Sequence, residues 1–174
     1  AIRKQFCTGF RISVVSRTII ITRQPLNTAG FRMEWHWGEP KSSGVHGCPP
    51  GTSIEVSDLF GNLPARRKFL RSSTAEASRI QELVSRYALV FPGVRFQLVV
   101  DGRTSFTSTG SGLPLEALLA VYGHQATTAM LEIHDDDLET GYQVDGFVSA
   151  PSLSRANRRY MTFFVNRRWV QSRM

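Results

Sequence analysis

Cysteine is scarce in this chain of 174 residues, which contains only Cys7 and Cys48. Two cysteines cannot form the disulfide framework of a small secreted domain, and they cannot complete a tetrahedral zinc site alone. Long hydrophobic runs are also absent: stretches such as residues 18–21 are the length of a strand, well below the ~18 residues that span a bilayer. No apolar core follows the first charged residues, so a secretory leader is not expected. These absences predict an intracellular protein without a membrane segment.

Metal-ligand spacing is missing as well. The four histidines are scattered and pair with no cysteine at the separations that zinc requires. The acidic residues 135–137 and Glu139 lack the glycine and the spaced ligands of a calcium-binding loop. We therefore expect them to form a solvated hairpin turn, and the sequence predicts no metal site among these residues.

Acidic residues are unevenly distributed. The chain has 21 Lys and Arg against 14 Asp and Glu, a net charge of +7. Residues 155–174 carry six arginines and no acid, and residues 64–86 carry six cations and two glutamates. Clustered cations bind polyanions by displacing counterions from phosphates, so this pattern favours a nucleic-acid partner. The alternative is that these arginines only keep helix surfaces solvated.

The hydrophobic pattern predicts a mixed α+β architecture in two layers. In the first third of the chain, β-branched and alternating stretches predict strands at 12–22, 31–37 and 52–60. Residues 24–30 read as a turn, and residues 40–51 read as a loop because they are rich in glycine, proline and serine. Alternation in the second strand places Trp35 and Trp37 on the same face.

Helices and further hairpins follow. A short helix is expected over 62–71, and apolar residues at spacings of three and four predict a longer one over 74–90. The Asp101-Gly102 pair predicts a tight turn between strands within 94–107. The remaining expected elements are a linker at 108–112, a helix at 113–122, and strands at 129–133, 142–149 and 161–165, with the acidic residues 135–137 in the turn between two of them.

Residues 51–71 carry the most specific signal, the run GTSIEVSDLFGNLPARRKFLR. A glycine permits close approach of the backbone to a phosphate, and the hydroxyl of Thr52 can donate a hydrogen bond to it. The helix that follows is rich in cations. For Arg66 and Arg67, a structural role in which they pair with an acid such as Asp58 is an equally open alternative.

In order and spacing this run resembles the MutL family of DNA mismatch repair proteins and its eukaryotic relatives. Two further pieces agree with the family's motifs: Gly9-Phe10-Arg11 with the strand that follows, and Phe163 to Arg168. The resemblance implies the C-terminal part of a GHKL (Bergerat) ATPase α/β sandwich, followed by part of a transducer domain like ribosomal protein S5. We expect the ATPase part to cover residues 1–109 and the transducer part residues 110–174.

The resemblance also implies site residues. Thr52 matches a threonine near the bound nucleotide, and Gly9, Phe10 and Arg11 match the segment that closes over the ATP phosphates. The positions implicated in DNA contact correspond here to Lys68, Arg71, Arg86 and Arg173. The implied cofactors are ATP and Mg²⁺.

Departures from the family pattern qualify this interpretation. The residues that normally follow Gly9-Phe10-Arg11 are missing, and Arg167 replaces the family's glycine. Asp145 stands where another basic contact is expected. The helix with the glutamate that activates water and the asparagine that holds Mg²⁺ is absent from this sequence. We therefore expect no ATP hydrolysis by this chain alone, although the parent protein is expected to convert ATP and water to ADP and phosphate.

The resemblance thus predicts an ATP-dependent switch that binds DNA without sequence preference and relays mismatch recognition to downstream repair factors. Expected partners are the DNA backbone, a second copy or a paralogue, and a mismatch-recognition protein of the MutS type. We expect the bacterial cytoplasm or nucleoid, or the eukaryotic nucleus, as the location. The alternatives are an ATP-independent basic DNA-binding fragment and a GHKL topoisomerase subunit, which the PARRKFL string disfavours.

Overall fold

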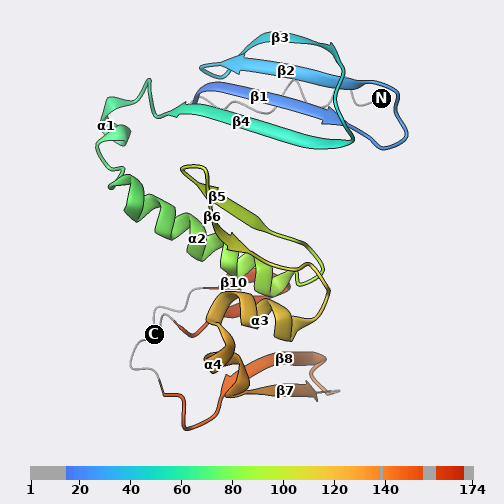
Figure 1. Ribbon diagram of the computed structural model, residues 1–174, viewed down its shortest axis with the longest axis vertical. Helices are drawn as coiled ribbons and strands as arrows, with labels where there is room; N and C mark the ends of the chain where they lie inside the picture. Colours follow the sequence, from blue (N-terminus) through green and yellow to red (C-terminus); the bar gives the residue numbers. More distant parts are fainter. Residues whose placement is uncertain (1–14, 138, 155–159, 171–174) are drawn as a thin grey trace. The chain divides into compact units, whose positions relative to one another are not determined.

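The computed structural model of the protein describes residues 15–137, 139–154 and 160–170. The chain divides into two compact units, Ala1–Ser72 and Ser73–Met174. Figure 1 shows strands in both units, with the longest helix at the start of the second. This mixture confirms the predicted α+β class.

The first unit is built on a four-stranded antiparallel sheet in the order β3-β2-β1-β4 (Figure 1). Its strands are β1 (Val15–Arg23), β2 (Gly30–His36), β3 (Glu39–His46) and β4 (Gly51–Leu59). Ile20 of the central strand β1 lies opposite Met33 on one side and Ile54 on the other. The neighbours Thr18 and Ile19 are only 2% and 7% exposed. Because successive strand residues point to opposite faces, β1 is covered on both faces at this point.

The prediction of a loop over residues 40–51 is wrong for most of these residues. Glu39–His46 forms the edge strand β3, which pairs with β2, and only residues 47–50 remain irregular. Pro40 is compatible with this strand because it lies at an edge, where a missing N–H can face solvent, and next to a register irregularity between Glu34 and Trp35.

The two tryptophans differ in burial, and only Trp35 lies within strand β2. Trp35 is buried in β2, whereas Trp37 lies beyond the end of that strand and is 48% exposed. Trp37 and Gly38 have φ angles of 54° and 84° and form the two-residue turn into β3. Positive φ at both turn residues matches the right-handed twist of the strands, so the hairpin ends the alternation one residue early.

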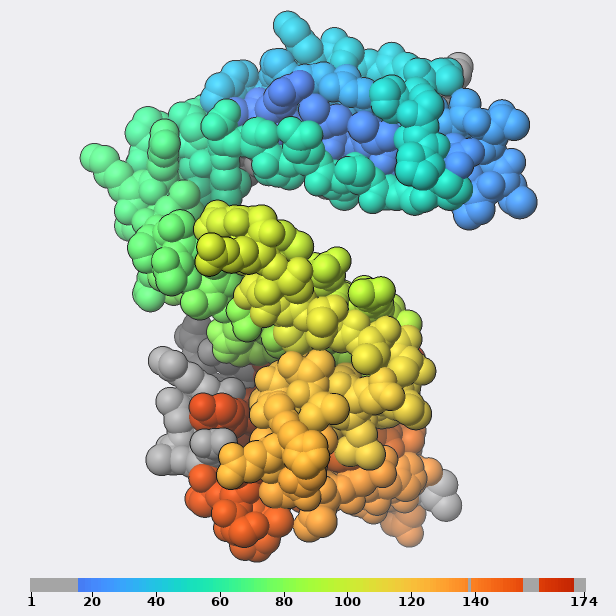
Figure 2. Space-filling model, in the orientation of Figure 1, coloured from blue at the N-terminus to red at the C-terminus, as the bar shows by residue number. Residues whose placement is uncertain are grey.

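A short, exposed helix follows the sheet. At the end of β4 the chain turns through Asp58 and Phe60, which both have positive φ, and the Asp58 carbonyl accepts a hydrogen bond from Ser16 Oγ at 2.9 Å. Helix α1 (Pro64–Arg67) begins at a proline, whose fixed φ suits the first helical position, and it is shorter than the predicted 62–71. Figure 2 shows this green segment protruding at the surface, and all residues of α1 are exposed.

The second unit begins with helix α2 (Ser73–Val90), which confirms the helix predicted over 74–90. Strands β5 (Gln97–Val100) and β6 (Arg103–Thr107) form the next hairpin, and helices α3 (Pro114–Tyr122) and α4 (His124–Thr128) follow it. Two more hairpins complete the unit: β7 (Met130–Asp137) with β8 (Tyr142–Ser149), and β9 (Phe163–Val165) with β10 (Arg168–Val170). Neither α4 nor β10 was predicted from the sequence.

Alanines make up much of the core of the second unit. Ala88 of α2 is fully buried, and Ala117 and Leu118 of α3 are 4% and 7% exposed. Helix α2 contacts α3, β5 and β6, and Phe106 of β6 is 7% exposed. Alanines allow neighbouring elements to approach closely, and Leu118 and Phe106 supply the larger buried apolar side chains.

The turn at Asp101-Gly102 is confirmed, since φ is 49° and 75° at its two residues. The following segment, predicted as a linker, is packed and hydrogen bonded. Ser108 is 6% exposed, and its Oγ accepts a hydrogen bond from the Phe96 backbone N–H at 2.9 Å. A Cβ at Gly110 would lie 2.6 Å from the backbone nitrogen of Arg95. This segment is therefore a fitted part of the second unit.

The acidic residues 135–137 lie in strand β7 rather than in the turn, which corrects the predicted boundary. Asp137 ends the strand: its Oδ1 accepts hydrogen bonds from the backbone N–H of Glu139 at 3.0 Å and of Thr140 at 3.3 Å. Hydrogen bonds from the Thr140 side chain and from both backbone groups lower the pKa of the Asp137 carboxyl. The turn is thus built by one aspartate, and the other two extend the pairing with β8.

None of the helices formed by the described residues combines the length and the apolar character that crossing a membrane requires.

Candidate nucleic-acid interface

Thr52 lies at the start of β4, directly opposite Thr22 of β1. Their hydroxyl oxygens are 2.8 Å apart, and Thr52 is exposed. Gly51 before it has φ of 127° and open space where a Cβ would stand. Backbone without a side chain, next to two hydroxyls, can approach and hydrogen bond an oxyanion such as a phosphate. The sequence identified Thr52 but not Thr22, which only the strand register brings to it.

Lys68 and Arg71 lie in the segment that contains α1. Lys68 ends the helix, with its backbone N–H bonded to the Pro64 carbonyl at 3.2 Å, and both side chains are exposed. Arg66 and Arg67 occupy the last turn of the helix, and residues 62–72 contain no acid. Within the part of the chain that the structure describes, no ion pair joins Asp58 to Arg66 or Arg67. The predicted alternative for these arginines therefore gains no support.

Arg86 is held within the second unit. It lies on the face of α2 that meets the β9–β10 hairpin, and its guanidinium carbon is 3.8 Å from the ring centroid of Trp169. Its Nη2 also donates to the Glu82 carboxylate one helical turn earlier. The Arg86 side chain is only 18% exposed. Stacking on an aromatic face and an ion pair at i, i+4 together fix where the cation lies.

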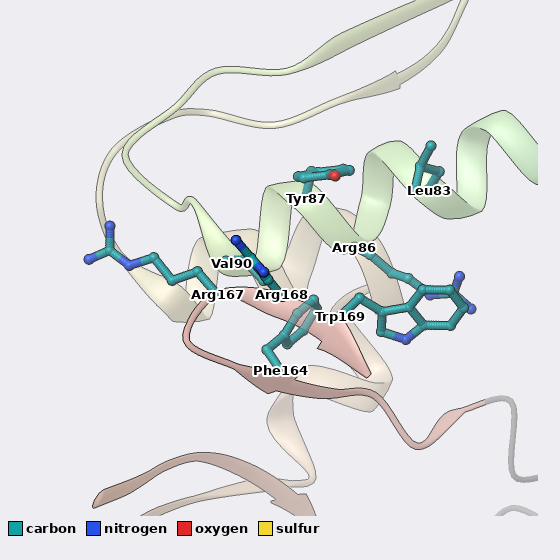
Figure 3. Close-up of a pocket in the computed structure, with 8 residues that line it drawn as sticks. All are labelled: Leu83, Arg86, Tyr87, Val90, Phe164, Arg167, Arg168 and Trp169. Atoms are coloured by element: carbon teal, nitrogen blue, oxygen red, sulfur yellow. The ribbon is translucent and has the colours of Figure 1, made fainter. Parts of the chain in front are cut away.

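A cavity of about 270 Å³ lies beside this contact, between α2 and the β9–β10 hairpin (Figure 3). Its lining combines arginines with aromatic and aliphatic side chains: Leu83, Arg86, Tyr87, Val90, Phe164, Arg167, Arg168 and Trp169. In Figure 3 the Trp169 indole covers Arg86, whereas Arg167 extends away from it. The cavity thus presents rings and cations together, a combination that suits a nucleic-acid strand.

Arg167 has the left-handed backbone conformation that favours glycine, the residue that the family pattern has at this position. Asn166 and Arg167 have φ of 49° and 63°, and they join β9 to β10. An arginine in this left-handed region is strained, because its Cβ approaches a carbonyl oxygen. The replacement of glycine by arginine therefore adds a cation without opening the turn.

Asp145 has a partner of its own. It lies opposite His134 in the β7–β8 hairpin, and the His134 Nδ1 and Asp145 Oδ1 atoms are 2.5 Å apart. Both side chains are 61% exposed. Asp145 therefore pairs within its own hairpin.

The predicted site residues fall into separate groups. Arg86 lies near Arg167 and Arg168 in the second unit, while Thr52, Lys68 and Arg71 belong to the first. Gly9, Phe10, Arg11 and Arg173 lie outside the described residues. The sequence placed Phe164 in the 163–168 motif without a site role and did not single out Trp169, although both lie in the basic segment 155–174, where aromatic residues close to arginines were an available signal. Among the described residues, no group of three His, Cys, Asp or Glu side chains could hold a metal ion.

Comparison with known proteins places these features in a family. The family model described as DNA mismatch repair protein, C-terminal domain, matches residues 118–174. The DNA mismatch repair protein MutL of Heliobacterium modesticaldum is 42% identical over 172 residues, which cover 95% of this chain and 26% of that protein. MutL of Desulforudis audaxviator is 43% identical over 170 residues, covering 94% of this chain and 30% of that protein.

A solved structure agrees with the sequence matches. The MutL ATPase domain of Aquifex aeolicus, described as complexed with ADP, superposes with a TM-score of 0.77 at 30% identity, over 93% of this chain and 61% of that one. The chain thus spans between a quarter and a third of the length of these two curated relatives. It belongs to the MutL family of DNA mismatch repair proteins and comprises part of the GHKL ATPase fold followed by part of the S5-like transducer fold.

Proposed function

We propose that this chain is the part of a mismatch repair protein in which nucleotide binding controls the grip on DNA. In this proposal, ATP orders a lid formed by Gly9, Phe10 and Arg11 and brings two N-terminal modules together. The basic surfaces then hold the DNA backbone, and the protein relays mismatch recognition to downstream repair factors. Membership of the MutL family supports this proposal.

The observation that carries the DNA-binding part is the exposed cationic segment around α1. Arg66, Arg67, Lys68 and Arg71 lie within six residues with no acid between residues 62 and 72, and all are exposed. Cations of this kind contact phosphates, which are the same for every sequence, so they provide affinity without sequence preference. Arg86, Arg168 and Arg173 would add contacts from the second unit.

The nucleotide-binding part rests on the start of β4. Thr52 and Gly51 offer a hydroxyl and an unobstructed backbone, which fit a phosphate or ribose oxygen. The related Aquifex aeolicus ATPase domain is described as complexed with ADP. Mg²⁺ would neutralise phosphate charge when bound, but the described residues offer no ligand group for it. Its ligands, and the group that activates water, are expected outside this sequence.

Domain division and partners are further parts of the proposal. We propose a boundary between the ATPase and transducer parts at residues 109 and 110, which the family match from residue 118 supports, whereas the second compact unit already begins at Ser73. A second copy or a paralogue is the proposed dimer partner, and a MutS-type protein is the proposed source of the mismatch signal.

Salt-dependent DNA binding tests the proposal. The full-length protein should bind unrelated duplexes of equal length with the same affinity, and the affinity should fall steeply between about 50 and 200 mM salt. Lys68→Gln and Arg71→Gln should each reduce the slope of log affinity against log salt by about 0.9, since each removes one phosphate contact. Fluorescence anisotropy measures both quantities.

Lys41→Gln is the matched control, because Lys41 is an exposed lysine on the edge strand β3, away from the α1 segment. It should leave the slope unchanged. Binding that is insensitive to salt and depends on base sequence would contradict the proposal. For the nucleotide, Thr52→Val removes the hydroxyl at nearly constant volume and should weaken ATP binding in equilibrium dialysis, whereas unchanged affinity would contradict that part.

A further inference from the structure

Trp169 and Arg86 come from segments 83 positions apart, yet their side chains are stacked. The Arg86 guanidinium carbon lies 3.8 Å from the indole centroid, which is well inside the distance at which a cation is attracted to an aromatic face. Glu82 engages the Nη2 end of the same guanidinium. Arg86 is therefore restrained both in the plane of its guanidinium and at one of its ends (Figure 3).

The indole is itself held in place by the hairpin. Trp169 lies directly opposite Phe164 in the β9–β10 pair, so both rings project from the same face of these strands. Leu83 and Tyr87 of α2 line the same cavity. An aromatic side chain has only two rotatable bonds, and here a cross-strand neighbour limits them further. Trp169 is thus a fixed surface against which a long, flexible arginine can be ordered.

Ordering matters for recognition of a phosphate. A guanidinium has five N–H donors in one plane, and it binds oxyanions through the edge of that plane. Stacking on Trp169 occupies the flat face and leaves the edges available, while Glu82 takes one of them. An arginine ordered before binding loses less side-chain freedom when the ligand arrives, so its contact is stronger.

We propose that Trp169 is a positioning residue that presents the edge of the Arg86 guanidinium to the DNA backbone. This inference rests on the proposed DNA-binding function and adds a residue to it. In this inference Trp169 acts through Arg86 rather than on DNA, since the guanidinium covers one face of its indole. Replacing Trp169 should therefore affect DNA binding only while an arginine is present at position 86.

The test is a double-mutant cycle in the full-length protein, with DNA affinity measured over a range of salt concentrations. Trp169→Leu and Arg86→Gln should each weaken binding several-fold and lower the salt slope by about 0.9. The double variant should bind no more weakly than Arg86→Gln alone. Trp169→Phe keeps an aromatic face and should retain most of the affinity. Tyr142→Leu, which removes an exposed aromatic side chain from β8, is the control and should change nothing.

Arg86→Lys gives a second readout that loss of stability would not reproduce. Lysine keeps the charge but has no planar group to stack, so it should bind DNA more weakly than arginine in the protein with Trp169 and equally well in the Trp169→Leu protein. Should Trp169→Leu fail to fold, the same comparison between arginine and lysine is made in Trp169→Phe, where the advantage of arginine should persist.

Three outcomes would overturn the inference. Trp169→Leu could weaken binding equally with or without Arg86, which would mean that the indole contacts DNA directly. It could leave affinity unchanged, or Arg86→Gln could have no effect while Lys68→Gln and Arg71→Gln do; in both cases the proposed DNA-binding function stands and the inference alone fails. If none of the four cation and tryptophan variants changes affinity, the proposed function fails together with the inference.

Discussion

Arg17 Nε donates a hydrogen bond of 2.8 Å to Glu34 Oε1 across the β1–β2 pair. Arg32 Nη2 lies 2.6 Å from the other carboxylate oxygen, and His36 Nε2 is 2.9 Å from Oε1. The four side chains lie on one face of the sheet, since their positions alternate with the buried Thr18 and Trp35. Hydrogen bonds from His36, Arg32 and Arg17 lower the pKa of Glu34 from 4.5 to about 2.

This network makes the first unit sensitive to acid. Because the pKa of Glu34 is lower in the folded state, the ionised carboxylate contributes stability that is fully present above about pH 4.5 and is lost as the pH falls towards 2. Glu34→Gln should lower the free energy of unfolding at pH 7. The difference in this free energy between the variant and the unmodified protein should shrink as the pH falls from 4.5 to 2. Urea unfolding at several pH values measures this.

Glu39→Gln is the control for that prediction, because it removes a carboxylate from the same sheet that makes none of the hydrogen bonds to Glu34. The free energies of unfolding of Glu34→Gln and of the unmodified protein could instead differ by the same amount down to pH 2. This would show that ionisation of Glu34 contributes nothing to stability.

Gly110 should not tolerate a side chain. Its φ is 73°, and an added Cβ would lie 2.6 Å from the backbone nitrogen of Arg95. Gly110→Ala should therefore lower the free energy of unfolding by about 2–4 kcal/mol. Gly93→Ala places a Cβ in open space and should change the free energy of unfolding by less than about 1 kcal/mol. Similar effects of the two substitutions in thermal unfolding would contradict the close fit of this segment.

Replacing Arg167 should stabilise the β9–β10 turn. At φ of 63° glycine has no steric cost, whereas arginine does, so Arg167→Gly should raise the free energy of unfolding by about 0.5–1 kcal/mol. Arg168→Gly, in the extended strand β10, should have the opposite sign because strand glycine is unfavourable. Calorimetry distinguishes the two, and destabilisation by Arg167→Gly would mean that the side chain contributes more than its strain costs.

Glu82 should limit DNA binding if Arg86 contacts phosphate. Its carboxylate occupies one end of the Arg86 guanidinium and carries the same charge sign as DNA. Glu82→Gln should therefore tighten binding a few-fold at low salt, with a smaller effect at 200 mM, where surface charges are screened. Glu76→Gln, two helical turns away beside Arg79, is the control and should have less effect. Weaker binding by Glu82→Gln would show that Glu82 orients Arg86 rather than competing for it.

Local signals predicted local structure well. Helix α2 follows from apolar residues at helical spacing, and the Asp101-Gly102 turn follows from the tolerance of these two residues for positive φ. The edge strand β3 was missed because the residues from Pro40 onwards have the composition of a loop. These residues form a strand because they pair with β2, and no pattern within residues 40–46 predicts that pairing.

The candidate site divides in the same way. Clustered charge and the 51–71 motif were sufficient to propose Thr52, Lys68, Arg71 and Arg86 as site residues, because these signals depend on residue type and order along the chain. The pairing of Thr22 with Thr52 depends on strand register, and the stacking of Trp169 on Arg86 depends on packing between α2 and the β9–β10 hairpin. Both bring together residues from distant parts of the chain.

The sequence alone therefore determined the family, the α+β class and the cationic segments, since composition, periodicity and motif order are properties of the order of residues along the chain. Only the tertiary structure decided which side chain restrains which cation, where the sheet ends, and which glycine and arginine lie in left-handed turns. The physical reason is that packing and register act between residues far apart in the chain. Their energies depend on distance in space, which amino-acid order does not record.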